Sequence, residues 1–206
     1  TEESTQFEEY YPTLKHRVVL AASSCFLVPL FREYLISNRV RDCARYNARK
    51  WLNKPVGREN IPNANSTNGT TIWIVPGGAL EGLYSNPDED WLDLRRKKGF
   101  LKLAVQHGIK VVPSYTFNEV SSVTQVHYNS VPSIIAFIRK YIWQRTIGIS
   151  LPLMYSFGFT DSDLTTVIGA PIELPYKYIE NPTDSQLEEC MDIYVNALQV
   201  LYDTHK

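Results

Sequence analysis

The stretch from Thr71 to Glu81 constrains the fold of this chain more than any other part of the sequence. A run of β-branched and aromatic residues ends at Gly77 and Gly78, and Glu81 follows within one helical turn. Paired glycines allow positive φ and a close approach of a ligand to the main chain. Because ligands of open α/β sheets gather at the carboxyl ends of strands, this pattern predicts a buried strand that delivers a turn and an acid to a site. An ordinary strand-to-loop turn is the alternative.

Predicted strands and helices alternate along the rest of the chain. This order predicts an α/β fold with a mostly parallel central sheet flanked by helices. With 206 residues, the chain is expected to form one domain, residues 1–206. Residues 53–70 are rich in Asn, Pro, Gly and Ser and are predicted to be a surface insertion. The remaining predicted strands are Arg17–Ala21, Lys110–Phe117 and Leu164–Ile168, and the helices are Pro29–Ser37, Asp42–Leu52, Trp91–His107, Val131–Trp143 and Thr183–His205.

Local signals mark the ends and faces of several of these elements. Gly108 is a natural residue to end the helix Trp91–His107. Pro113 cannot donate to a strand ladder, so it is expected at a sheet edge or near a strand end. The predicted inner face of the helix before Gly108 consists of Phe100, Leu103, Ala104 and His107.

The final helix carries the clearest pattern in the sequence. Thr183 followed by Gln186 forms a capping box. Apolar residues then recur at helical spacing and predict one buried stripe, formed by Leu187, Met191, Tyr194, Leu198 and Leu201.

The charge and cysteine content exclude some classes of partner. A net charge of -1 and a pI near 6.4 give no support for nucleic-acid binding. Cys25, Cys43 and Cys190 lack metal-site spacing and cannot all pair, which favours a reducing compartment and predicts no metal. Two glycosylation sequons, at Asn65 and Asn68, leave lumenal exposure open.

No apolar run reaches the roughly 20 residues that a membrane-spanning helix needs. The segment Val131–Trp143 is apolar and aromatic over a broad face and carries cations beside it. Such a helix lies either in a lipid interface or in a core from which its cations reach solvent.

Few residues have an obvious catalytic setting. None of the four histidines lies in a nucleophile triad pattern, and the sequence contains no Gly-x-Ser-x-Gly elbow and no nucleotide-binding glycine pattern after a strand. A basic run, Arg95–Lys98, precedes Gly99 near the start of a predicted helix. It is expected either to hold a phosphate or to be a solvated basic turn that balances the acidic residues before it.

Several blocks of the sequence together resemble the type-2 diacylglycerol acyltransferase family. These blocks occur in the family's order, and the resemblance spans nearly the whole chain from Phe26. PLFREYL, residues 29–35, resembles the upstream arginine motif of the family. The other blocks are PGGALE at 76–81, RRKKGFLKLAVQHG at 95–108, VVPSYTFNE at 111–119, TTVIGAPIELP at 165–175 and the segment 180–206.

The resemblance implies a fold like that of the glycerolipid acyltransferases and an enzyme that transfers an acyl chain from acyl-CoA to a hydroxyl. Diacylglycerol is the expected acceptor, and triacylglycerol the product. A monoacylglycerol or long-chain alcohol acceptor is the alternative, as is a noncatalytic lipid-binding relative. Acyl-CoA enters as co-substrate, with no other cofactor. The family is bound to the endoplasmic reticulum membrane and lipid droplets, with its catalytic face toward the cytosol.

The chain departs from the family's motifs in three places. The His-Pro-His-Gly motif, which holds the proposed catalytic histidine, has no counterpart here and is expected upstream of Thr1, together with a hydrophobic membrane segment. The chain is therefore expected to be an N-terminally truncated piece that is inactive alone. The family's Phe-Gly-Glu-Asn reads Phe117-Asn118-Glu119-Val120, and its histidine in the final helix corresponds to Met191.

The candidate site residues follow from these motifs. Glu81 is the predicted catalytic acid that orients the base or the acceptor, and Gly77 and Gly78 are predicted to leave room for the thioester and to offer amides to the oxyanion. The predicted substrate contacts, for CoA phosphates or the acceptor, are Arg32, Lys97, Lys98, Gly99 and Glu119.

Overall fold

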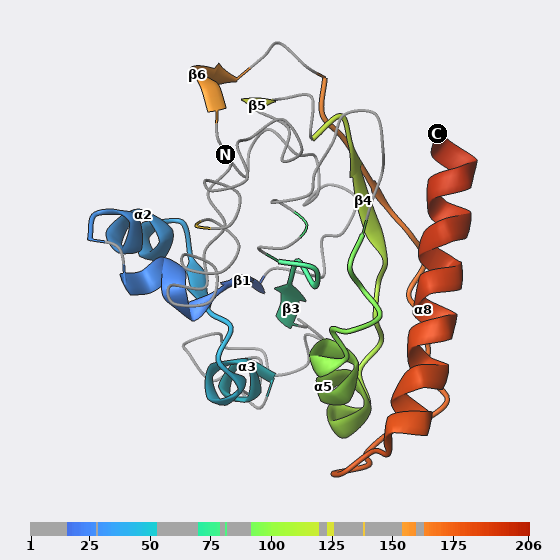
Figure 1. Cartoon of the computed structure of the whole chain (residues 1–206). Coiled ribbons are helices and arrows are strands. Elements are labelled where there is room, and N and C mark those ends of the chain that lie inside the picture. The colour runs from blue at the N-terminus through green and yellow to red at the C-terminus, as the bar shows by residue number, and fades with distance from the viewer. Residues whose placement is uncertain are drawn as a thin grey trace, which may run out of the picture. The chain divides into compact units, whose positions relative to one another are not determined.

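The computed structural model describes residues 16–27, 29–52, 70–78, 81, 92–119, 123–125, 138, 154–159 and 163–206 (Figure 1). They fall into two compact units, residues 1–75 and residues 76–206. The predicted surface insertion at 53–70 lies outside the described residues except for Thr70, and the predicted helix Val131–Trp143 lies outside them except for Ile138.

Residues 1–75 contain a three-stranded parallel sheet of order β2-β1-β3. Its strands are β1 (His16–Ala21), β2 (Val40–Asp42) and β3 (Thr70–Trp73). Because parallel neighbours need a crossover connection, the chain passes from β1 to β2 through η2 (Ser23–Leu27) and α2 (Phe31–Ser37). A further helix, α3 (Arg45–Leu52), follows β2. The parallel sheet with its helices confirms the predicted α/β class.

Two boundaries in this unit differ from the prediction. Asp42 ends β2, where it pairs with Ala21 of β1, and the helix predicted from Asp42 begins at Arg45. The Oδ1 of Asp42 accepts a hydrogen bond from the backbone N–H of Ala44 at 2.9 Å, just before α3. The strand before the glycine turn ends at Trp73, and it is half-buried where a buried strand was predicted. Val75 is 74% exposed, so the chain has left the sheet before it reaches Gly77.

Residues 76–206 are organised around two helices that pack side by side, α5 (Gly99–His107) and α8 (Asp184–His205) (Figure 1). The prediction that the first of these begins at Trp91 is wrong, because residues 92–98 form turns that end at Lys98, the N-cap of α5. The buried face of α5 is also displaced by one position from the predicted one and consists of Leu101, Ala104 and Val105. Phe100 only packs against the edge of this core.

The helix ends follow the local signals. Thr183 and Gln186 form the predicted capping box at the start of α8. Gly108 ends α5 with φ 63°, the left-handed conformation expected of a terminating glycine. The predicted stripe of α8 is buried from Leu187 to Leu198, and Cys190, which the pattern missed, is buried within it.

The remaining strands of this unit pair antiparallel, whereas the alternation of elements predicts parallel neighbours. β4 (Ser114–Phe117) pairs with β7 (Thr165–Ile168), and β5 (Val123–Gln125) pairs with β6 (Met154–Phe159). Pro113 lies directly before β4, as expected of a residue that cannot donate. The predicted buried strand at 164–168 is exposed over its first half. Among the described helices, none is both long and apolar enough to cross a bilayer.

Candidate functional site

The carboxyl group of Glu81 is held at a defined position by the main chain of a distant turn. Its Oε1 accepts a hydrogen bond from the backbone N–H of Asp93 at 2.9 Å. The side chain is half-buried. The acid predicted from the motif is therefore anchored at one oxygen rather than free in solvent.

Gly77 provides the space in which this carboxyl lies. A Cβ atom built on Gly77 coincides with the carboxyl atoms of Glu81, so a side chain at 77 and the observed position of Glu81 exclude each other. The sequence predicts that this glycine makes room for the thioester, but the room directly over it holds the Glu81 carboxyl. The amide role predicted for Gly77 stays a prediction.

Gly78 is a glycine for a different reason. Its φ is 62°, which L side chains rarely adopt, and a Cβ there meets no atom within 4 Å. It is exposed. The main chain at Gly78 therefore turns sharply and is exposed, and its predicted role toward the thioester stays a prediction.

The surroundings of Glu81 favour its protonated form. Burial is the main cause that raises the pKa of Glu81 above its ordinary value, and the carboxylates of Asp93 and Glu119 act in the same direction. The backbone N–H of Asp93 and the ammonium of Lys97 act against them. A carboxyl whose pKa is raised binds a proton more strongly than an ordinary one, and its ionised form is a stronger hydrogen-bond acceptor.

Three other segments interact with Glu81, namely residues 93–97, the end of β4 and α8. The sequence motifs predict some of their residues as site residues but not others. Glu119 and Lys97 are predicted site residues, and both are exposed. Asp93 was missed, because it contributes a backbone N–H that no side-chain pattern reports. Tyr194 was predicted only as a core residue of α8, yet its pKa is raised by burial and then by the charge of Glu81, so the two side chains lie within electrostatic reach of each other.

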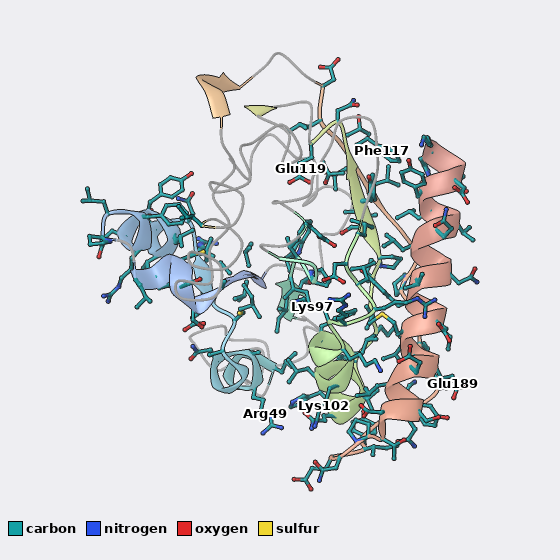
Figure 2. All side chains as sticks on the ribbon, viewed as in Figure 1. Arg49, Lys97, Lys102, Phe117, Glu119 and Glu189 are labelled. Carbon is teal, nitrogen blue, oxygen red and sulfur yellow. The ribbon has the colours of Figure 1, made fainter. Side chains whose placement is uncertain are left out.

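Lys98, next to Lys97, makes different contacts. Its Nζ forms an ion pair with Glu188 of α8, and this bond raises the pKa of Lys98. Arg95 of the same basic run forms an ion pair with Asp192 of α8 at 2.8 Å. Two of the four residues of the predicted phosphate-binding run, Arg95 and Lys98, therefore contact acidic side chains of α8. Lys97 of the same run lies above the start of α5 in Figure 2. The substrate-binding role of Lys98 stays a prediction.

The other predicted residues lie as follows. Gly99 is the exposed first residue of α5, and a Cβ there meets no atom within 4 Å. Arg32 is exposed on α2, in residues 1–75. Met191, at the position of the family's histidine, is 0% exposed and belongs to the core. Within the described residues, no group of His, Cys, Asp or Glu side chains has the arrangement of a metal site.

Comparisons with known proteins agree over the whole length of the chain. The model of a family described as diacylglycerol acyltransferase matches residues 1–206. Diacylglycerol O-acyltransferase 2 of Bos taurus is 33% identical over 99% of this chain and 55% of its own length. The proteins of the same name from Xenopus tropicalis and Dictyostelium discoideum are each 34% identical, over 99% and 98% of this chain and over 55% and 59% of their own lengths. The chain spans about half the length of these relatives, and no solved structure matches it.

Proposed function

The chain belongs to the diacylglycerol acyltransferase family, and we propose that it forms part of an acyl-CoA-dependent O-acyltransferase that converts diacylglycerol to triacylglycerol. The names of its relatives and the order of the shared motifs support this acceptor. Acyl-CoA is the proposed co-substrate, with no further cofactor.

One observation carries the proposal, namely the position of the Glu81 carboxyl. It lies over Gly77, accepts the N–H of Asp93, and has a raised pKa beside the open turn at Gly78. An anchored carboxyl next to exposed main chain is an arrangement that binds a hydroxyl group and holds a developing charge.

The proposed reaction has no covalent enzyme intermediate. The hydroxyl oxygen of the acceptor attacks the carbonyl carbon of the thioester, the C–S bond breaks, and CoA leaves as a thiolate that takes up a proton. The resemblance assigns the base that takes the hydroxyl proton to the histidine of a His-Pro-His-Gly motif, which the sequence of this chain does not contain. Glu81 then orients that histidine or the acceptor hydroxyl, and its raised pKa strengthens the hydrogen bond that it accepts.

The cations have separate proposed tasks. Lys97 is exposed and close enough to Glu81 to affect its pKa, so it is suited to a CoA phosphate bound near the reacting atoms. Arg32 is the second proposed phosphate or acceptor contact.

A lipid acceptor and a lipid product favour a membrane location for the complete protein. The proposed location is the endoplasmic reticulum membrane, with the catalytic face toward the cytosol, and lipid droplets. The segment Val131–Trp143 is the proposed interfacial helix, on the sequence pattern alone.

An acceptor panel tests the proposed function. Microsomes that contain the complete protein are supplied with labelled acyl-CoA and, separately, with diacylglycerol, monoacylglycerol or a long-chain alcohol. We expect labelled triacylglycerol to be the main product, and no labelled product from microsomes without the protein. A dominant diacylglycerol or wax-ester product would assign one of the other acceptors. No transfer to any acceptor, at normal expression, would favour a noncatalytic lipid-binding relative.

A further inference from the structure

The end of β4 is fixed to α8 by aromatic contacts. The ring of Phe117 lies 4.8 Å from that of Tyr115 and 5.7 Å from that of Tyr202 on α8, measured between centroids. Figure 2 shows Phe117 on the side of β4 that faces α8. The direction in which Phe117 points is therefore set by its ring contacts with Tyr115 and Tyr202.

Glu119 does not follow the alternation of the strand. In an extended strand, residues two apart point to the same face, so Glu119 would share the α8 side with Phe117. Instead, Figure 2 shows Glu119 on the opposite side of β4 from α8. Asn118 lies between them with φ 64°, and this left-handed residue ends the alternation and reverses the direction of the side chain that follows.

Asn118 has two properties that hold this turn. Asparagine tolerates the left-handed conformation better than other residues with a side chain, apart from aspartate. In addition, its Nδ2 donates a hydrogen bond to the backbone carbonyl of Asp163 at 3.0 Å, just before β7. The β4–β7 pair ends with Phe117 opposite Thr165, so this bond continues the connection between the two strands past the last paired residues.

We propose that Asn118 is a positioning residue that turns Glu119 away from α8 and holds its carboxylate on the opposite side of β4, within electrostatic reach of Glu81. A glycine at this position would allow the same backbone turn, and the asparagine adds a bond that restricts it. The catalytic consequence, two carboxyls from distant segments near the acceptor hydroxyl, rests on the proposed function. The positioning itself does not.

The test is the titration of the Glu81 carboxyl, followed by carbon NMR in the full chain. Among the described residues, the charged groups that act on Glu81 are Asp93, Glu119 and Lys97, and the charge of Glu81 acts in turn on Tyr194. Because the charge of Glu119 raises the pKa of Glu81, Glu119→Gln should lower the titration midpoint, and it defines the full effect of that charge.

Variants at position 118 test whether the left-handed backbone turn, which Asn118 allows, positions Glu119. We expect Asn118→Ala, which disfavours positive φ and removes the amide, to lower the midpoint by at least about half of the Glu119→Gln shift. Asn118→Gly, which retains the turn, should keep the midpoint near that of the wild type. Should the alanine variant fail to fold, Asn118→Ser makes the same comparison, because serine also lacks the amide and disfavours positive φ.

Two results overturn the proposal. An unchanged midpoint in Glu119→Gln shows that the charge of Glu119 does not act on Glu81. An unchanged midpoint in Asn118→Ala or Asn118→Ser, alongside a shift in Glu119→Gln, removes the role of Asn118. Acyl-transfer assays on the same variants form a separate arm, in which Asn118→Ala should lower kcat/KM by about the same factor as Glu119→Gln. If the wild type transfers no acyl group, the proposed function fails, while the titration still decides the positioning.

Discussion

Glu81 and Glu173 are carboxyls of the same unit in opposite electrostatic surroundings. Glu173 is exposed between two cations, with Lys110 Nζ 2.8 Å from its Oε1 and Lys177 Nζ 3.0 Å from its Oε2, and these hydrogen bonds lower its pKa to about 2. Glu81 is half-buried near the carboxylates of Asp93 and Glu119, and its pKa is raised. The first arrangement stabilises the charged form of a carboxyl, whereas the second disfavours it.

The charges that neighbour a carboxyl distinguish a structural ion pair from a candidate functional group in this fold. Surface ion pairs such as those of Glu173 or Lys98 place opposite charges together, and such pairs contribute little beyond local order. Carboxyls gathered around one half-buried carboxyl oppose folding, and a group perturbed in this way is a candidate for a functional site. By this criterion, the turn that contains Glu81 is the candidate functional region.

The strongest test of this contrast is Glu81→Gln. In the complete protein we expect acyl transfer to fall by about 100-fold, because a neutral amide accepts a weaker hydrogen bond than a carboxylate and orients the histidine or the acceptor hydroxyl less firmly. Stability should change in the opposite direction. A raised pKa in the folded state means that ionisation of Glu81 opposes folding at pH values above its unfolded-state pKa. The variant should therefore melt at a higher temperature than the wild type at neutral pH, and this gain should vanish in acid. A variant with full turnover would exclude Glu81 from the mechanism.

The pair Gly77→Ala and Gly78→Ala tests the position of the same carboxyl. A methyl group at 77 takes the place of the Glu81 carboxyl, which is the flexible end of its side chain and moves away. We expect at least about a tenfold loss of kcat/KM with little change in unfolding free energy. At 78 the methyl group meets no atom, but positive φ should cost about 1 kcal/mol in a urea titration, with activity largely retained. Equal losses of activity in both variants would contradict the distinction.

Replacement of the adjacent lysines sharpens the contrast between the two regions. Lys97 lowers the pKa of Glu81, so Lys97→Met should raise that pKa and move the acid limb of the kcat/KM profile to higher pH. Lys98 contacts Glu188 instead, and Lys98→Met should leave the limb where it is. A profile that moves equally in both variants would show that the limb does not report on Glu81.

The smallest effect is expected for Glu173→Gln. Its activity should match that of the wild type, because this carboxyl is exposed and pairs with the surface lysines Lys110 and Lys177. The lowered pKa of Glu173 means that its ion pairs add stability above its unfolded-state pKa and lose it as the pH falls toward about 2. The difference in melting temperature between wild type and variant should therefore be small at neutral pH and disappear in acid. A clear loss of acyl transfer would break the division between structural and functional carboxyls.

Short sequence signals predict correctly those features of the structure that depend on only a few neighbouring residues. The capping box of Thr183 and Gln186, the left-handed Gly108 and the place of Pro113 before β4 all match the prediction. Gly77 and Glu81 are also close in space, as expected for residues only four positions apart. These features depend on backbone conformation and on short-range hydrogen bonds, and the residue types alone specify them.

Tertiary packing decided what those signals leave open. Alternation predicts a strand but not its direction, so the antiparallel pairing of β4 with β7 depends on how the chain returns. Two adjacent lysines look alike in sequence, yet only Lys98 meets Glu188, because α8 packs against the start of α5. Likewise, Asp93, Glu119 and Tyr194 interact electrostatically with Glu81 from separate segments of the chain. Burial and Coulomb interactions act through space, and only the folded chain brings these groups within their range.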